Sequence, residues 1–273
     1  MKEEFQKYKG FIFDLDGTIY LGDKLIPGAA AVVETLRREG RRVVFLSNKP
    51  LDRRETYARK LTKLGIVTPP QDVINSAYVL AQLLAKETPG ARVYVTGEPP
   101  LLAELAENGL QVLTSAQALA GPVDAVIAAF DRTLNYEKLD TAFQALKKGA
   151  RFLATNADRT CPVDGGELPD AAGVIAFLEA TTGRKLEFVA GKPNALMLQV
   201  ACERLGADPA ECLMTGDRLE TDMRMGIEAG MDTAAVLSGV STREEAEDYR
   251  RKMGGRGPTH ILRSVAEIVH VES

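Results

Sequence analysis

The fold of this chain is decided by the stretch Phe11-Ile12-Phe13-Asp14-Leu15-Asp16-Gly17-Thr18. Its apolar start is typical of a buried β-strand, and Gly17 predicts a turn directly after the acidic residues. In a parallel α/β sheet the binding crevice lies at the carboxyl ends of the strands. We therefore expect Asp14 and Asp16 to lie at a functional site. A polar strand end followed by a simple turn is the alternative interpretation.

Similar apolar runs recur along the chain and alternate with helical stretches that end at glycines, as in an α/β fold with a parallel sheet. The other predicted strands are Val43 to Leu46, Val93 to Val95, Ala125 to Phe130, Phe152 to Ala154, Phe188 to Ala190, Leu213 to Thr215 and Ala234 to Leu237. Helix starts are predicted at Asp52 with Glu55, at Ser241 with Glu244, at Ser76 and at Asn135.

The composition is that of an ordinary globular protein. The 273 residues include 45% hydrophobic and 26% charged residues, and the net charge is −4. Without a basic excess, nucleic acid is not expected as a partner. No signal peptide and no apolar run of about 18 residues is visible, so we expect no membrane association and a cytoplasmic location.

Cysteine and histidine are too few for several kinds of site. Cys161, Cys202 and Cys212 lack metal-site spacing and are predicted to be free thiols in the core. His260 and His270 both lie in the last segment, which excludes a histidine-centred triad or a histidine metal cage. Catalysis must therefore rest on carboxylates, hydroxyls or lysine.

Two further strand ends carry groups that can bind an anion. The run Val43 to Leu46 ends in Ser47-Asn48, whose hydroxyl and backbone N–H groups can donate to a phosphoryl oxygen. Lys192 follows another strand, and Pro193 suits a first helical turn, so a positive charge is expected at a helix N-terminus. The alternatives are turn chemistry at Ser47 and an exposed lysine at 192.

A fourth apolar run leads into Gly216-Asp217-Arg218-Leu219-Glu220-Thr221-Asp222. Asp217 can reach a divalent cation, and Asp222 can hold a metal-bound water or orient Lys192. Either carboxylate could instead cap a helix.

In this order the four fragments, Asp14-Leu15-Asp16-Gly17-Thr18, Ser47-Asn48, Lys192-Pro193 and Gly216 to Asp222, resemble the motifs of the haloacid dehalogenase superfamily of phosphatases. Phe130 to Leu139 and Ala154 to Asp158 look like the NagD and p-nitrophenylphosphatase branch. The resemblance implies a Rossmann-like core formed by residues 1–75 and 185–273. A large α/β cap domain would be inserted at residues 76–184, and a homodimer would form through that cap.

The resemblance also implies a reaction, the hydrolysis of small phosphate monoesters through an aspartyl-phosphate on Asp14. Asp16 would protonate the leaving alkoxide and then deprotonate the attacking water, while Ser47 and Lys192 hold the phosphoryl group. Oxygen ligands from Asp14, the Asp16 carbonyl and Asp217 favour Mg²⁺, with Asp222 just outside the ligand set.

Substrate recognition is expected from the inserted domain. The polar stretch from Thr155 to Gly173, with Asn156, Asp158 and Asp170, is irregular and suits a loop that faces the site. We expect Asn48, Asn156 and Asp158 to contact the substrate, a small phosphate ester; a surface loop without substrate contact is the alternative. Three alternative functions stay open: a phosphotransferase or mutase of the same superfamily, a phospho-acceptor receiver domain, and a non-catalytic binding protein.

Overall fold

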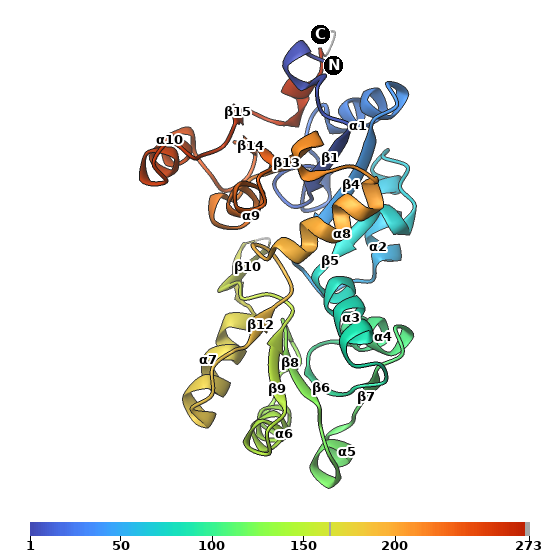
Figure 1. The fold of residues 1–273 in the computed structure, drawn as a ribbon, viewed down its shortest axis with the longest axis vertical. Coiled ribbons are helices and arrows are strands. Elements are labelled where there is room, and N and C mark those ends of the chain that lie inside the picture. The colour runs from blue at the N-terminus through green and yellow to red at the C-terminus, as the bar shows by residue number, and fades with distance from the viewer. Residues whose placement is uncertain (164, 271–273) are drawn as a thin grey trace. The chain divides into compact units, whose positions relative to one another are not determined.

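The structure is a computed structural model that describes residues 1–163 and 165–270. These residues pack as two compact units (Figure 1). The first unit consists of Met1–Ser47, Arg54–Ile74 and the described residues from Lys192 onward, and the second of Asn48–Arg53 and Asn75–Gly191.

A six-stranded sheet in the order β15-β14-β13-β1-β4-β5 forms the centre of the first unit. Its strands are β1 (Gly10–Asp14), β4 (Arg42–Ser47), β5 (Val73–Asn75), β13 (Cys212–Gly216), β14 (Asp232–Val236) and β15 (His260–Leu262), beside a small pair, β2 (Tyr20–Leu21) and β3 (Lys24–Leu25). Strand β1 pairs in parallel with both β4 and β13, which confirms the predicted parallel α/β core. The carboxyl ends of these three strands therefore lie at one edge of the sheet.

Helices cover both faces of this sheet. They are α1 (Ala29–Arg38), α2 (Arg54–Lys63), α8 (Ala195–Leu205), α9 (Arg224–Glu228) and α10 (Arg243–Lys252), with short helical turns at Glu3–Phe5, Pro70–Asp72, Pro209–Glu211, Leu219–Met223 and Val265–Ile268. Alternate residues of β1 point to opposite faces. Phe11 and Phe13 thus share one buried cluster with Val32 of α1 and Leu61 of α2, while α8 packs against β1 and β4 and α9 against β14.

The second unit has its own sheet, in the order β12-β9-β8-β6-β7. The strands are β6 (Arg92–Thr96), β7 (Gln111–Val112), β8 (Ala125–Ala128), β9 (Arg151–Ala154) and β12 (Phe188–Val189), and the helices are α3 (Ser76–Glu87), α4 (Pro99–Glu107), α5 (Ser115–Ala120), α6 (Tyr136–Lys147) and α7 (Ala171–Thr182). Helices α5, α6 and α7 bury apolar residues with Val126 and Phe152 on one face of this sheet.

The predicted boundaries differ from the structure in two places. Asn48–Arg53, predicted to lie in the core, belongs to the second unit. The return to the core was predicted at residue 185, whereas β12 pairs in parallel with β9 and belongs to the second sheet. The signal that suggested a joint, Thr182-Gly183, is the end of α7, where Gly183 adopts φ 72° as the helix C-cap. The first unit resumes at Lys192 instead.

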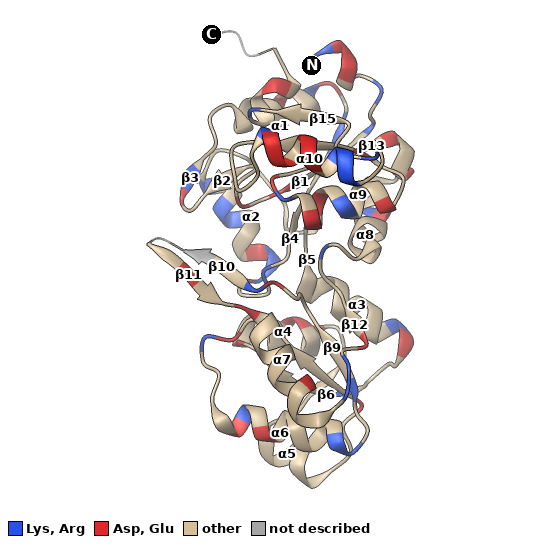
Figure 2. Ribbon diagram, turned by 90° about the vertical axis from the view of Figure 1, so that its left-hand side faces the viewer, with Lys and Arg blue, Asp and Glu red and all other residues tan. Residues whose placement is uncertain are grey.

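The stretch from Thr155 to Gly173 is also more regular than predicted. It contains an antiparallel hairpin of β10 (Thr160–Val163) and β11 (Gly166–Pro169), which projects from the second unit in Figure 2. Gly165 in the connection adopts φ 83°, a conformation that suits a tight hairpin turn.

The three cysteines are buried and free, as predicted. Within the described residues, no helix combines the length and the apolar character needed to cross a membrane.

Candidate active site

The carboxyl edge of the first sheet brings the predicted catalytic side chains together. Asp14 is the last residue of β1, Ser47 is the last residue of β4, and Asp217 follows β13 directly. Lys192 lies in the segment before α8. This helix begins later than predicted, because its N-cap is Asn194 and Pro193 lies before the helix. All four side chains are buried.

Lys192 connects two carboxylates. Its Nζ donates a hydrogen bond to Asp14 Oδ1 and another, 2.7 Å long, to Asp222 Oδ1. Asp222 Oδ2 in turn accepts a bond of 3.2 Å from the backbone N–H of Arg218. Both oxygens of Asp222 thus have donors within the protein, which fixes this side chain beside Lys192.

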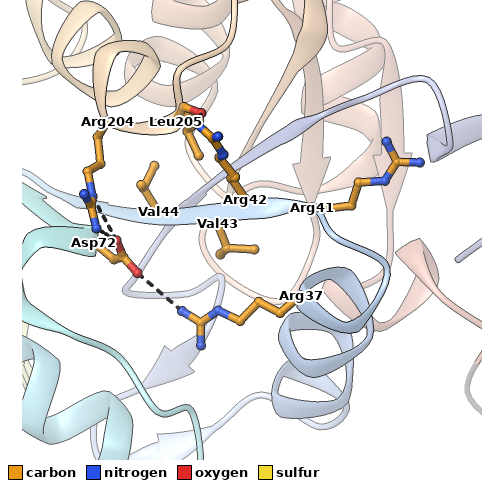
Figure 3. A pocket seen from close by; sticks show the side chains of 8 residues that line it. All are labelled: Arg37, Arg41, Arg42, Val43, Val44, Asp72, Arg204 and Leu205. Atoms are coloured by element: carbon orange, nitrogen blue, oxygen red, sulfur yellow. Dashed lines mark hydrogen bonds and ion pairs between the residues drawn. The ribbon is translucent and has the colours of Figure 1, made fainter.

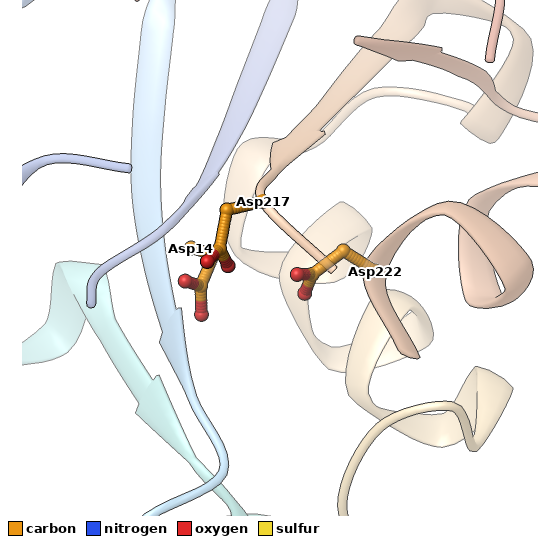
Figure 4. Close-up of side chains that lie close together, drawn as sticks. All are labelled: Asp14, Asp217 and Asp222. Carbon is orange, nitrogen blue, oxygen red and sulfur yellow. The ribbon is translucent and has the colours of Figure 1, made fainter. Parts of the chain in front are cut away.

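Asp14, Asp217 and Asp222 form a compact acidic cluster (Figure 4). Each offers one oxygen, and these three oxygens lie within 4.8 Å of one another. Asp217 Oδ2 accepts a bond of 2.9 Å from Val240 N–H, but the buried Oδ1 has no hydrogen-bond partner among the described residues. A buried carboxylate oxygen without a donor is costly unless a cation binds it, so the donor set fits a hard divalent cation.

The charges of the cluster support the same conclusion. Burial raises the pKa of Asp14, and although Lys192 lowers it, the carboxylates of Asp222 and Asp217 raise it further. Burial and the charge of Asp222 raise the pKa of Asp217 to about 6. Burial lowers the pKa of Lys192, but Asp14 and Asp222 more than reverse this, so the ammonium stays charged. When all three carboxylates are ionised, they and the ammonium carry two net negative charges, which one divalent cation balances.

Glycines allow this close packing. A Cβ on Gly17, which adopts φ 81°, would lie 2.5 Å from Asp217 Oδ2, and one on Gly239 would lie 2.0 Å from the same oxygen. A Cβ on Gly216 would meet the side chain of Asp222 at 2.4 Å. A side chain at any of these positions would therefore displace a carboxylate of the cluster.

The loop after β14 also contacts the acidic cluster and was not predicted from the sequence. Ser238 Oγ donates a bond of 2.7 Å to the carbonyl of Gly17, and Val240 N–H holds Asp217. The loop could have been found from its position, because β14 is a neighbour of β13 in the sheet and its carboxyl end lies at the same edge.

Asp16 occupies a different position from Asp14. It is half-buried, forms an isolated bridge with Tyr20, and does not contribute a carboxylate to the acidic cluster. A turn begins directly after Asp16, where the Gly17 N–H donates to the carbonyl of Tyr20. This divergence suits two different chemical roles.

A second polar group, of Asn48, Asn156, Asp158 and Asp170, lies within the second unit. Asn156 Nδ2 donates to Asp158 Oδ2 and to Asp170 Oδ1, each at 3.0 Å, and Asn48 Nδ2 donates to Asp158 Oδ2 at 3.1 Å. Asp170 is also the N-cap of α7 and accepts a bond from Ala171 N–H. Asn156 and Asp170 are buried, so Asp158 and Asn48 are the more exposed members of this network.

Comparisons with known proteins agree with the site. Residues 11–111 match the family model of haloacid dehalogenase-like hydrolases, and residues 189–268 match a HAD-hydrolase-like model. Sugar-phosphatase AraL of Bacillus subtilis is 37% identical over 259 residues, which is 95% of this chain and 91% of that protein.

Solved structures give the same result over the whole fold. The 4-nitrophenylphosphatase of Thermotoga maritima superposes with a TM-score of 0.89 at 34% identity and covers 98% of both chains. The glycerol phosphate phosphatase of Mycobacterium tuberculosis, determined in complex with magnesium, has a TM-score of 0.89 at 31% identity and covers 99% of this chain and 79% of that one.

The chain therefore belongs to the haloacid dehalogenase-like hydrolases. It is an enzyme of the branch that includes the nitrophenylphosphatases, which confirms the resemblance inferred from its motifs.

Proposed function

We propose that this enzyme is a Mg²⁺-dependent phosphatase of small phosphate monoesters, with sugar phosphates as the substrate class. The observation that carries the proposal is the buried contact of Lys192 with Asp14 and Asp222, beside the unpaired Oδ1 of Asp217. An ammonium and a divalent cation around one carboxylate nucleophile are what phosphoryl transfer requires, since catalysis of this reaction rests on positioning and charge stabilisation.

Asp14 acts as the nucleophile in this proposal. Its carboxylate oxygen forms a bond to phosphorus while the bond between phosphorus and the ester oxygen breaks. At about 4 Å, and with an effective dielectric constant near 20, each pair of like charges in this approach costs roughly 4 kcal/mol. Lys192 offsets part of that repulsion, and Ser47 donates a hydrogen bond to a phosphoryl oxygen.

Asp16 transfers the protons. It gives a proton to the leaving alkoxide, and it then takes one from the water that attacks the aspartyl-phosphate, so that Asp14 and orthophosphate are regenerated. Its position outside the cluster that contains Asp14 supports this division of roles, because one group can reach the leaving oxygen while the other reaches phosphorus.

Asp14, Asp217 and the carbonyl of Asp16 would hold Mg²⁺, and Asp222 would orient Lys192. When bound, the ion supplies positive charge against the phosphoryl oxygens. The solved relative that contains magnesium supports this choice of metal.

The relatives and the polar group of the second unit support this substrate class. The relatives act on a sugar phosphate, on 4-nitrophenyl phosphate and on glycerol phosphate, which share a phosphate monoester on a small leaving group. We assign leaving-group recognition to Asp158 and Asn48, with Asn156 holding Asp158 in place.

A phosphate-release screen with Mg²⁺ tests the proposal. Sugar phosphates, phosphoglycolate, pyridoxal phosphate and nucleotides are ranked by kcat/KM, with p-nitrophenyl phosphate as an artificial substrate. Free orthophosphate from a single sugar phosphate is the expected result. Phosphate that appears only on an added alcohol would identify a phosphotransferase, and no turnover of any ester would favour a binding protein.

A further inference from the structure

A pocket of about 320 Å³ lies in the first unit at the amino end of β4 (Figure 3). Arg42 begins this strand and Ser47 ends it, so roughly 16 Å of extended chain separates the pocket from the predicted phosphate-binding hydroxyl. Val43, Val44 and Leu205 line the pocket together with charged side chains from three other elements. We refer to it as the arginine pocket.

Three guanidinium groups surround the arginine pocket, and they come from distant parts of the sequence. Arg37 lies in the last turn of α1, Arg42 starts β4, and Arg204 lies in the last turn of α8. Arg41 also borders the pocket, but its guanidinium points away from Asp72 in Figure 3. The three arginines therefore converge through the fold and not through a basic run of sequence.

Asp72 is the single acidic residue in this lining. Arg204 Nε and Nη2 donate to Asp72 Oδ1 at 3.0 and 2.8 Å, whereas Arg37 Nη2 stays 3.8 Å from Asp72 Oδ2. The distance of 3.8 Å is too long for a hydrogen bond, and this Nη2 has no hydrogen-bond partner among the described residues. Asp72 thus balances one of the four arginine charges in the lining, and three remain.

The other contacts hold the arginines in place without neutralising them. Arg42 Nη1 donates to the carbonyl of Leu205, and Arg37 Nη1 donates to the carbonyl of Val67. A Cβ on Gly206 would lie 2.5 Å from Arg42 Nη1, so this glycine leaves room for the guanidinium. Arg42 forms no ion pair with Asp72 among the described residues. Holding that carboxylate in place therefore does not explain the position of Arg42 beside the pocket.

We propose that the arginine pocket binds a phosphate dianion, as orthophosphate or as a small phosphate monoester, at a site separate from the acidic cluster. The excess of positive charge in this lining suits a phosphate dianion. Guanidinium forks fit phosphate oxygens with paired, charge-assisted hydrogen bonds. The volume of about 320 Å³ lies at the lower end of the range for small-molecule pockets. This proposal does not depend on the proposed reaction.

The test is a titration of the ¹⁵N-labelled full chain with orthophosphate, followed by amide chemical shifts at constant ionic strength and with EDTA present. The amides of Arg42, Val43, Asp72 and Leu205 should shift and saturate by about 10 mM phosphate, a weak but specific affinity. A second titration uses a glycerol phosphate, which identifies the ester as the better ligand if it saturates the same amides at lower concentration.

A double variant separates the arginine pocket from the active site. In Arg42→Gln/Arg204→Gln, phosphate should bind the pocket at least about tenfold more weakly, because charge-assisted bonds are lost. Shifts of Gly17 and Val240, beside the acidic cluster, should be the same as in the wild type. Arg38→Gln is the matched control, since Arg38 is an exposed neighbour on α1 whose guanidinium bonds Thr35.

Wild-type protein alone can overturn the proposal, whether or not the double variant folds. Pocket amides that stay unshifted, or that drift in proportion to phosphate without saturation, would contradict a site. Saturation by succinate but not by either phosphate would contradict the ligand class. Unchanged saturation in a folded double variant would contradict the residues assigned.

Discussion

Asp222 Oδ1 accepts a hydrogen bond of 2.7 Å from Lys192 Nζ, which joins two segments that lie 30 residues apart in the sequence. Asp222 is completely buried, and Arg218 N–H occupies its other oxygen. The contact with Arg218 thus fixes the Asp222 carboxylate independently of the lysine. Its bond to Lys192 then holds the ammonium beside Asp14. Asp222 acts through Lys192 in this arrangement.

The first prediction concerns that pair. Asp222→Asn keeps the shape of the side chain but removes the charge that orients and retains the ammonium, so kcat should fall about 10- to 100-fold, or roughly 1.4 to 2.7 kcal/mol. Steady-state kinetics and a thermal melt check this. Asp23→Asn is the control, because that carboxylate is 98% exposed and should leave both measurements unchanged. A variant with wild-type kcat would show that Lys192 is positioned by Asp14 alone.

The second prediction concerns the nucleophile. Asp14→Asn should fold but lose turnover, since an amide cannot attack phosphorus as a carboxylate does. Circular dichroism and phosphate release from p-nitrophenyl phosphate provide the two measurements. If the variant kept more than about a tenth of the wild-type kcat, an effect of only ~1.4 kcal/mol, a covalent mechanism on Asp14 would be wrong.

The parallel core and the position of Asp14 could be predicted from the sequence because both follow from local signals. An apolar run followed directly by acidic residues and glycine indicates the end of a buried strand, and β1 does end at Asp14. The rule that parallel strands share a carboxyl edge then places Ser47 and Asp217 nearby. Asn135 was likewise predicted correctly as a helix N-cap.

The exact helix caps and the partner of Asp217 could not be predicted, because they depend on the positions of backbone groups. Ser241 with Glu244 was the predicted cap of α10, but Thr242 and Glu245 form it, one residue later with the same spacing. Asn75 rather than Ser76 caps α3, while Ser76 Oγ donates to the carbonyl of Asn48. Val240 holds Asp217 through its N–H, for which the residue type carries no signal.

The third prediction concerns the metal. EDTA should abolish activity and Mg²⁺ should restore it, because the predicted ligands are all oxygens. Asp217→Asn should raise the Mg²⁺ concentration for half-maximal activity by at least about tenfold, since a charged ligand becomes a neutral one. A Mg²⁺ titration of both proteins measures this. Full activity in chelated protein shown to be metal-free would exclude a metal requirement.

The fourth prediction concerns stability below neutral pH. His260 is partly buried, with its Nε2 3.2 Å from Tyr8 Oη and its ring beside Phe5. Burial lowers the pKa of His260 below 6.5. Lys7 also lowers this pKa, whereas Glu4 and Asp232 raise it. The folded state then binds fewer protons than the unfolded state, so the contribution of neutral His260 is complete above pH 6.5 and is lost as the pH falls.

His260→Gln tests this pH dependence, because the glutamine amide can still form a hydrogen bond with Tyr8 Oη but does not titrate. Urea unfolding at several pH values between about 8 and 5 should show that the wild type loses more free energy of unfolding than the variant. The acidic cluster titrates in both proteins and cancels in the difference. An equal loss in both proteins would show that His260 does not cause the effect.

The fifth prediction separates two aspartates of the second unit, Asp158 and Asp170, which were predicted to lie in one loop. Asp170 caps α7, so Asp170→Ala should lower the free energy of unfolding by about 1 kcal/mol, and Asp170→Ser should restore most of it.

Asp158 is only partly buried and is proposed to contact the leaving group. Asp158→Ala should therefore change kcat/KM for a sugar phosphate and for p-nitrophenyl phosphate by unequal factors, since only leaving-group contacts are lost. Equal changes for every ester would place substrate recognition elsewhere.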